Sequence, residues 1–218
     1  MSIALSIGNN LTTGRVFTAD AVNNTSVTNV TDFASVPGGG ILKLLSTQTA
    51  SASATIDFTS GIDSTYDSYV FKFINIHPST DSDGSLTFQA NASGGSGFNE
   101  TMTTTYFRAY HTESDSTASF SYDNSKDQGQ GTSYQILSAN IGGDNDECGS
   151  GTLQIFNPSS TTFVKNFICN ASTYHSTSAA RHDFTAGYFN TTSAIDEISF
   201  KMDIGNIDSG TIKMYGVV

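Results

Sequence analysis

Short alternations of apolar and polar residues recur along most of this chain and constrain its fold more than any other feature. Near the C-terminal end, every second residue is apolar, which is the period of a strand with one buried and one wet face. Segment 205–210 is dense in residues that tolerate tight turns, and the alternation resumes after it. The residues expected on the buried faces are Ile198, Phe200, Met202 and Ile204, then Ile212 and Met214. This region therefore predicts two consecutive half-buried strands.

The same kind of pattern extends over the whole of residues 39–218. Strand-like runs lie at 41–48, 54–58, 68–77, 85–90, 103–111, 118–122, 133–139, 151–157, 162–171 and 183–190, before the final pair. Turn clusters separate them, and no convincing amphipathic helix interrupts them. We expect an all-β fold: an antiparallel two-sheet β-sandwich, jelly-roll-like, with an extended N-terminal arm.

The predicted arm covers residues 1–38. It is rich in Asn, Thr and Ser, and Pro37 with the glycines after it breaks the chain before the first strand signal. A segment this polar cannot build its own core. It therefore either docks on another subunit or folds back as an extra strand. The residues that we expect to dock are Ile3, Leu5, Ile7, Leu11, Val16 and Phe17.

Composition and charge narrow the classes of partner. Charged residues make up only 13% of the chain, and 9 Lys and Arg stand against 20 Asp and Glu, for a net charge of −11. Such a surface repels phosphate backbones, so we expect no nucleic-acid partner. The chain has no long apolar run and its first residues do not resemble a secretory signal, so we expect no membrane partner and assembly in the cytoplasm.

Two further strands look apolar on both faces, around residues 69–76 and 163–169. Strands of this kind need a second covering surface, which subunit packing can supply. The residues proposed for such an interface are Val70, Ile74, Val164 and Ile168, and a closed homo-oligomer, a trimer, would bury them.

The two cysteines, Cys148 and Cys169, are too few for a disulfide scaffold. A hairpin turning at 158–161 would place Cys169 opposite Ser150, and so bring the two thiols within a couple of residues of each other. Reduced thiols are the favoured reading for a protein made in the cytosol, and a bond between them is the alternative.

Catalytic and metal-binding patterns are weak, so we expect neither an enzyme nor a cofactor. No carboxylate pair, hydrolase triad or histidine pair has the required spacing. Acidic turns offer oxygen ligands for calcium at Asp81, Asp83, Asp144 and Asp146, but the EF-hand pattern is missing and solvated turns without a metal are the favoured interpretation. Tyr134 and Tyr174, which lie near loops, are the residues that we would test for contact with a glycan.

Several stretches resemble virion structural proteins of marine tailed bacteriophages. They lie at 44–53, 58–78, 103–111, 156–164, 186–194 and 205–216, and include FTSGIDSTYDSYVFKFINIHP. The resemblance implies a non-enzymatic, jelly-roll-like module that oligomerises on the virion, found in small head and tail proteins and in the C-terminal domains of tail fibres. It transfers no catalytic residues.

These observations lead to one expected function and one alternative. We expect a virion structural protein, a capsid decoration or head-associated protein that its arm anchors to other virion proteins. The alternative is a tail-fibre or receptor-binding domain that recognises host surface glycans.

Overall fold

The computed structural model describes residues 41–80 and 83–218. Residues 40–218 form one compact unit, and the predicted arm lies outside the described residues. The arm residues proposed for docking therefore also lie outside them: Ile3, Leu5, Ile7, Leu11, Val16 and Phe17.

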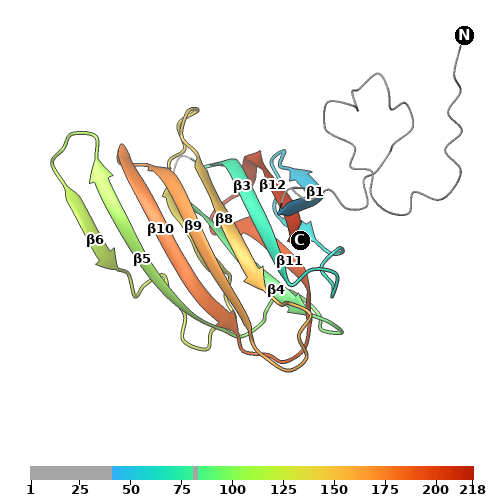
Figure 1. Ribbon diagram of the computed structural model, residues 1–218. Coiled ribbons are helices and arrows are strands. Elements are labelled where there is room, and N and C mark those ends of the chain that lie inside the picture. The colour runs from blue at the N-terminus through green and yellow to red at the C-terminus, as the bar shows by residue number, and fades with distance from the viewer. Residues whose placement is uncertain (1–40, 81–82) are drawn as a thin grey trace, which may run out of the picture. The chain divides into compact units, whose positions relative to one another are not determined.

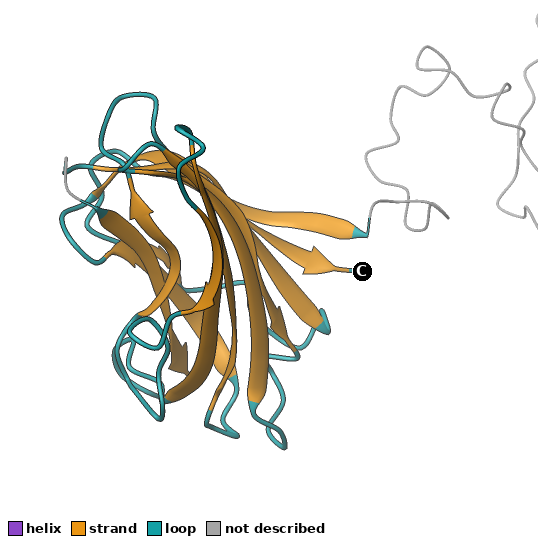
Figure 2. Ribbon diagram, turned by 90° about the vertical axis from the view of Figure 1, so that its left-hand side faces the viewer, coloured by secondary structure: helices purple, strands orange, loops and turns teal. Residues whose placement is uncertain are grey.

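The described residues form an all-β fold without helices, in which all strand pairs are antiparallel (Figures 1 and 2). The strands are β1 (Leu42–Thr49), β2 (Ile56–Phe58), β3 (Ser68–Pro78), β4 (Gly84–Ala92), β5 (Met102–Thr112), β6 (Ala118–Tyr122), β7 (Gln135–Ile141), β8 (Gly149–Phe156), β9 (Lys165–His175), β10 (Ala179–Phe189), β11 (Ile195–Met202) and β12 (Ile207–Val217). In this part of the chain no helix is long and apolar enough to span a membrane.

The twelve strands of the described residues join into one nearly closed, barrel-like sheet. It consists of two runs of neighbouring strands. The long run has the order β6-β5-β10-β9-β8-β3-β12-β1, and the short run has the order β7-β4-β11-β2. Among the described residues, Ile141 and His175 form the only backbone strand pair between the runs, with hydrogen bonds from Gly142 N–H to Tyr174 O (3.1 Å) and from Ser176 N–H to Asn140 O (3.3 Å).

Aromatic side chains from both runs meet in the core. Phe88 of β4 is fully buried, and its ring centroid lies 5.0 Å from that of Phe167 of β9 and 5.9 Å from that of Phe189 of β10. Phe71 of β3 packs against Phe200 of β11 in the same way, with a centroid distance of 5.5 Å. Burial of these rings holds the two runs together where the backbone does not.

The two cysteines do not approach each other as the expected hairpin register requires. Cys169 lies opposite Leu153, and Ser150 lies opposite Ser172. The prediction that Cys169 faces Ser150 was therefore wrong, because β9 begins only at Lys165 and the connection after β8 is longer than the assumed turn. Both thiols are free, and burial raises the pKa of Cys169.

His175, at the junction of the two runs, makes stability depend on pH. Its Nδ1 accepts a hydrogen bond from Thr177 N–H (3.2 Å), and burial, followed by the charge of Arg181, lowers the pKa of His175, whereas Asp83 opposes this shift. Below about pH 6.5 the unfolded chain therefore takes up a proton that the folded chain resists. We expect the free energy of unfolding to fall as the pH falls through this range, and to fall less steeply in His175→Gln. Urea unfolding at several pH values measures both slopes, and equal slopes would contradict the prediction.

Candidate functional site

A groove lies on the outer face of the long run, where β5, β9 and β10 approach their turns. It consists of two adjoining depressions of about 690 and 480 Å³, which share His111, Ser172 and Ala180 as lining residues. The strand register explains their proximity, because Ala180 pairs with His111 on one side and with Tyr174 on the other. We call these two depressions together the outer groove.

Small side chains on neighbouring strands make the groove hollow. Ser172 lies directly opposite Ser150, and Ala180 lies one row further along the same face. Larger side chains, among them His111 and Tyr174, stand beside these positions and form the walls. The hollow is therefore a result of side-chain size on paired strands.

The rim of the outer groove is polar and acidic. A hydrogen bond with Ser178 lowers the pKa of Tyr174, but the hydrogen bond with Glu113, burial and the charges of nearby carboxylates together outweigh it, so the pKa of Tyr174 is raised. The phenol therefore keeps its proton near neutral pH and can donate it in a hydrogen bond. Asp146 adds a further carboxylate to the lining, so the rim suits an uncharged ligand rich in hydroxyl groups better than an anion.

An exposed aromatic cluster adjoins the groove on the same face of β5, β6 and β10. We define it as Phe107, Phe120, Tyr122, His182 and Phe184. Phe107 and Phe184 lie opposite each other with stacked rings, 4.7 Å between centroids, and His182 stacks on Phe184 at 4.0 Å. Because these rings cover one another's faces, they present mainly their edges to solvent.

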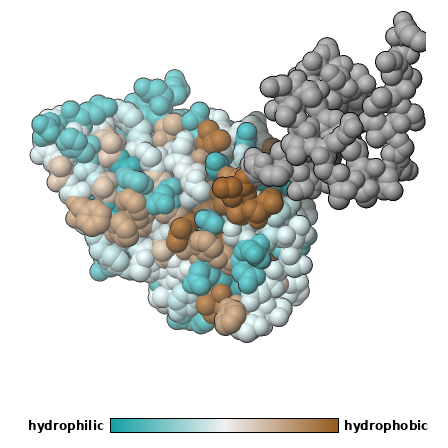
Figure 3. Space-filling view, in the orientation of Figure 1, coloured by the Kyte–Doolittle hydropathy of each residue, from teal (hydrophilic) through white to brown (hydrophobic). Residues whose placement is uncertain are grey.

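The outermost members of the cluster are the most exposed. Phe120 is 71% exposed and Tyr122 is 55% exposed, both on β6. Figure 3 shows apolar side chains interrupting the polar surface of this face, in one group towards β5 and β6 and in another towards β3 and β1. Exposed apolar area of this kind marks interaction surfaces.

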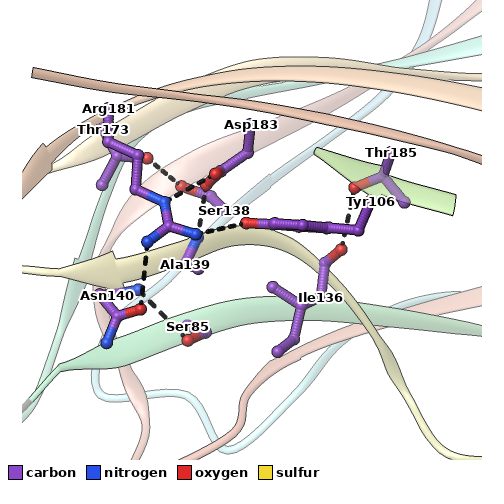
Figure 4. A network of polar contacts seen from close by, with 10 residues as sticks. All are labelled: Ser85, Tyr106, Ile136, Ser138, Ala139, Asn140, Thr173, Arg181, Asp183 and Thr185. Carbon is purple, nitrogen blue, oxygen red and sulfur yellow. Dashed lines mark hydrogen bonds and ion pairs between the residues drawn. The ribbon is translucent and has the colours of Figure 1, made fainter. Parts of the chain in front are cut away.

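A buried polar network lies directly beneath the groove, on the inner side of the same strands (Figure 4). Arg181 Nε donates to Asp183 Oδ1 (2.7 Å), and Arg181 Nη2 donates to the hydroxyl of Tyr106 (2.9 Å). The second carboxylate oxygen of Asp183 accepts a hydrogen bond from Ala139 N–H (2.8 Å) of β7. Strand alternation turns His182 and Phe184 outward, whereas Arg181 and Asp183 turn inward.

The network is shielded from water. Arg181 and Asp183 are buried together, and desolvation followed by the charge of Asp183 raises the pKa of Tyr106 far above its usual range. Asp183 also bonds to the backbone of β7, so the network links β5, β10 and β7. It holds in place the strands whose other faces form the outer groove.

The two tyrosines proposed for glycan contact lie in different surroundings. Tyr174 lines the outer groove. Tyr134 donates from its hydroxyl to Ser199 Oγ (3.1 Å), and the Nζ of Lys201 lies 4.2 Å from its ring centroid. The face of the Tyr134 ring is thus covered by Lys201, and this residue takes no part in the groove.

The four residues proposed for an oligomer interface are not equally accessible. Ile74 and Ile168 are exposed on the outer face of the long run. Val70 lies on that face too, between Gln154 and Tyr215, but is itself buried. Val164 is half-buried and lies just before β9.

The acidic residues proposed for calcium, as far as the structure describes them, have different surroundings. Asp81 lies outside the described residues, and Asp83 accepts a hydrogen bond from the hydroxyl of Ser176. Asp144 N–H donates to Glu147 Oε2 (2.9 Å), and Asp146 lines the outer groove. Among residues 41–80 and 83–218, no group of three or more His, Cys, Asp or Glu side chains could hold a metal ion.

Sequence reasoning missed the aromatic cluster and the network beneath it. Phe120 and Tyr122 stand at alternate positions of one predicted strand, which indicates that their side chains share a face of the sheet. Nothing in the sequence shows that Phe107 and Phe184 are cross-strand neighbours, since that depends on how distant strands pair.

The chain matches no protein-family model, no curated protein and no solved structure.

Proposed function

We propose that this protein is a non-enzymatic surface protein of a bacteriophage virion, in a decoration or head-associated role. In this proposal the long and short runs are the two sheets of a jelly-roll-like sandwich, and residues 1–38 anchor it to other virion proteins. The observation that carries the proposal is the exposed outer face, where Phe120 and Tyr122 stand uncovered in a chain with few charges. A surface of this kind suits lasting contact with other proteins.

The polar groups of the domain also support a structural role. The most deeply buried ion pair, Arg181 with Asp183, is satisfied within the core and bonds to the backbone of a neighbouring strand. At the outer groove, His111 Nε2 contacts Asp115 Oδ1 at 2.9 Å, with both side chains largely exposed. These are the contacts of a stable scaffold and a solvated rim.

Immunoelectron microscopy of intact particles tests this function. An antibody against residues 143–149, which cover most of the connection from β7 to β8 and the first residue of β8, would bind close to the outer groove, which Asp146 and Cys148 line. We expect label spread over the icosahedral shell. Label confined to the tail would favour host recognition instead, and particles without label would contradict the virion assignment.

Recognition of host glycans is the second candidate function, and the outer groove is the observation that favours it. A floor of small side chains beside a tyrosine and a polar rim can accommodate a sugar ring with its hydroxyl groups. The acidic rim argues for a neutral glycan. The aromatic cluster contributes less to such a site, because its stacked rings offer edges and not faces.

We expect Tyr174→Ala to weaken binding to host surface glycans about tenfold or more, because loss of a ring contact or a hydrogen bond of this kind costs about 1.4 kcal/mol. A glycan array followed by titration calorimetry measures the change. Tyr134→Ala is the matched control, since it removes a tyrosine outside the groove, and a thermal melt checks the fold of both variants. Unchanged binding by a folded Tyr174→Ala variant would exclude the groove as the glycan site.

A further inference from the structure

Within residues 41–80 and 83–218, strand β6 leaves one side of its backbone unpaired at the end of the long run. In this part of the chain it pairs only with β5, through a register that runs from Phe107 opposite Tyr122 to His111 opposite Ala118. Figure 1 shows β6 as the outermost strand on this side of the domain. A free edge is a template for pairing with another strand.

The other edge strands of the described residues carry features that discourage such pairing. In β1, Lys43 and the register irregularity between Leu44 and Ser46 disturb the edge. β2 is three residues long and contains Asp57. β6, with the sequence ASFSY, has no charge, no proline and no bulge in its pairing. Natural edges are protected by such features, so their absence from β6 points to a partner strand.

The hydrogen bonds to β5 show which backbone groups of β6 are free. Thr112 N–H donates to Thr117 O, and Asp123 N–H donates to Tyr106 O, each at 3.0 Å. Bonded pairs alternate along an antiparallel ladder, so residues 119 and 121 also face β5. The backbone groups of Ala118, Phe120 and Tyr122 therefore point away from the domain.

The sequence of β6 complements itself in one antiparallel register. We propose that a second copy of this chain pairs with β6 about a two-fold axis at Phe120. Each Phe120 then lies opposite the partner's Phe120 in a hydrogen-bonded pair, and Ala118 lies opposite the partner's Tyr122, a small residue against a large one. These are the three residues whose backbone groups are free.

The flanking charges are compatible with this register. Continuing the ladder by one residue places Thr117 opposite the partner's Asp123, so no like charges face each other directly. A one-residue slip would instead turn the aromatic side chains of one copy against the serines of the other. The register centred on Phe120 is thus favoured over the neighbouring one-residue slips.

The two-fold axis is perpendicular to the sheet, because antiparallel neighbours are related in this way. Both outer faces then lie on the same side, and the two aromatic clusters become one surface across the join. Such a contact closes as a pair, which differs from the trimer expected from the sequence. The pairing does not depend on what the outer groove binds.

The full-length chain tests the proposal through its mass and its amide exchange. We expect light scattering to give twice the 23.0 kDa of one chain, and hydrogen exchange of the Phe120 amide to slow as protein concentration rises. Phe120→Pro removes the outward N–H, and Phe120→Lys places like charges opposite each other. Each variant should weaken dimerisation about tenfold or more.

Ile168→Lys is the matched control, because it places a charge on the same outer face but on β9, away from the edge. It should leave the dimer intact. A monomer at every concentration would overturn the proposal. A dimer or trimer that dissociates in Ile168→Lys but persists in both folded Phe120 variants would also overturn the proposal. The interface would then be the outer face around Ile168 and not the edge of β6.

Discussion

Asp183→Ala is expected to lower the free energy of unfolding by about 3–5 kcal/mol, a large part of the stability of a typical domain. The substitution leaves the guanidinium of Arg181 buried without its counter-ion, and it removes the acceptor for Ala139 N–H. Charges cut off from water are costly when unpaired, which is why the loss exceeds that of a surface ion pair. Urea unfolding at neutral pH followed by circular dichroism measures it.

The matched control replaces both charges, as Arg181→Met with Asp183→Leu. Because apolar side chains of similar size replace both members of the ion pair, no unpaired charge is left buried. The double variant should therefore retain more stability than Asp183→Ala. The surface pair of His111 and Asp115 offers a second comparison, and Asp115→Ala should change stability by less than about 1 kcal/mol. If Asp183→Ala lowered the free energy of unfolding by no more than Asp115→Ala does, water would have to reach the buried network.

Phe88→Ala is expected to cost about 3–5 kcal/mol, because it removes a fully buried ring from the centre of the core. The ring contacts Phe167 and Phe189 of the long run, so its loss leaves a cavity between the two runs. Few backbone hydrogen bonds connect the runs, and the cavity therefore weakens the contact that holds them together. Thermal and urea unfolding both report the change.

Phe163→Ala provides the control for ring size, since this phenylalanine is 70% exposed and lies outside the strands. We expect a change within about 0.5 kcal/mol. Phe88→Leu, which fills part of the cavity, should lie between the two alanine variants. Equal effects of Phe88→Ala and Phe163→Ala would mean that the core does not depend on this ring.

Local alternation predicted the strands well, because burial on one face of a strand imposes a period of two. Ile198, Phe200 and Met202 are buried as expected, and so are Ile212 and Met214. Ile204 is exposed, contrary to the expected pattern. The reason is that β11 ends at Met202, and Asp203 Oδ1 then accepts a hydrogen bond from Ser85 N–H (2.7 Å), so the alternation does not continue.

Charged residues on buried faces were beyond sequence reasoning. Lys165 occupies an inward position of β9 and is buried, yet its Nζ donates to the carbonyl oxygens of Phe163 (3.0 Å) and Thr191 (3.2 Å). Those acceptors come from two separate connections, and only the fold brings them to the lysine. The same holds for Arg181, whose acceptors include the hydroxyl of Tyr106, a residue far away in the sequence.

The candidate site was predicted in part. Tyr174 was identified from its place near a loop, and it does line the outer groove. Its neighbours were not found, because Ser150 and Ala180 are small residues whose importance lies in the space they leave. A hollow depends on which strands are adjacent, and that information is absent from any single stretch of sequence.

The sparse junction between the two runs has a consequence for mechanics. Along most of the sheet, separating neighbouring strands means breaking a whole ladder of backbone hydrogen bonds, but between the two runs the described backbone pairs only at Ile141 and His175, and side-chain contacts supply the rest. Under a pulling force we therefore expect the two runs to separate at this junction before neighbouring strands within a run do. Protonation of His175 in acid would destabilise the same junction, so low pH and a pulling force would act at the same place in the fold.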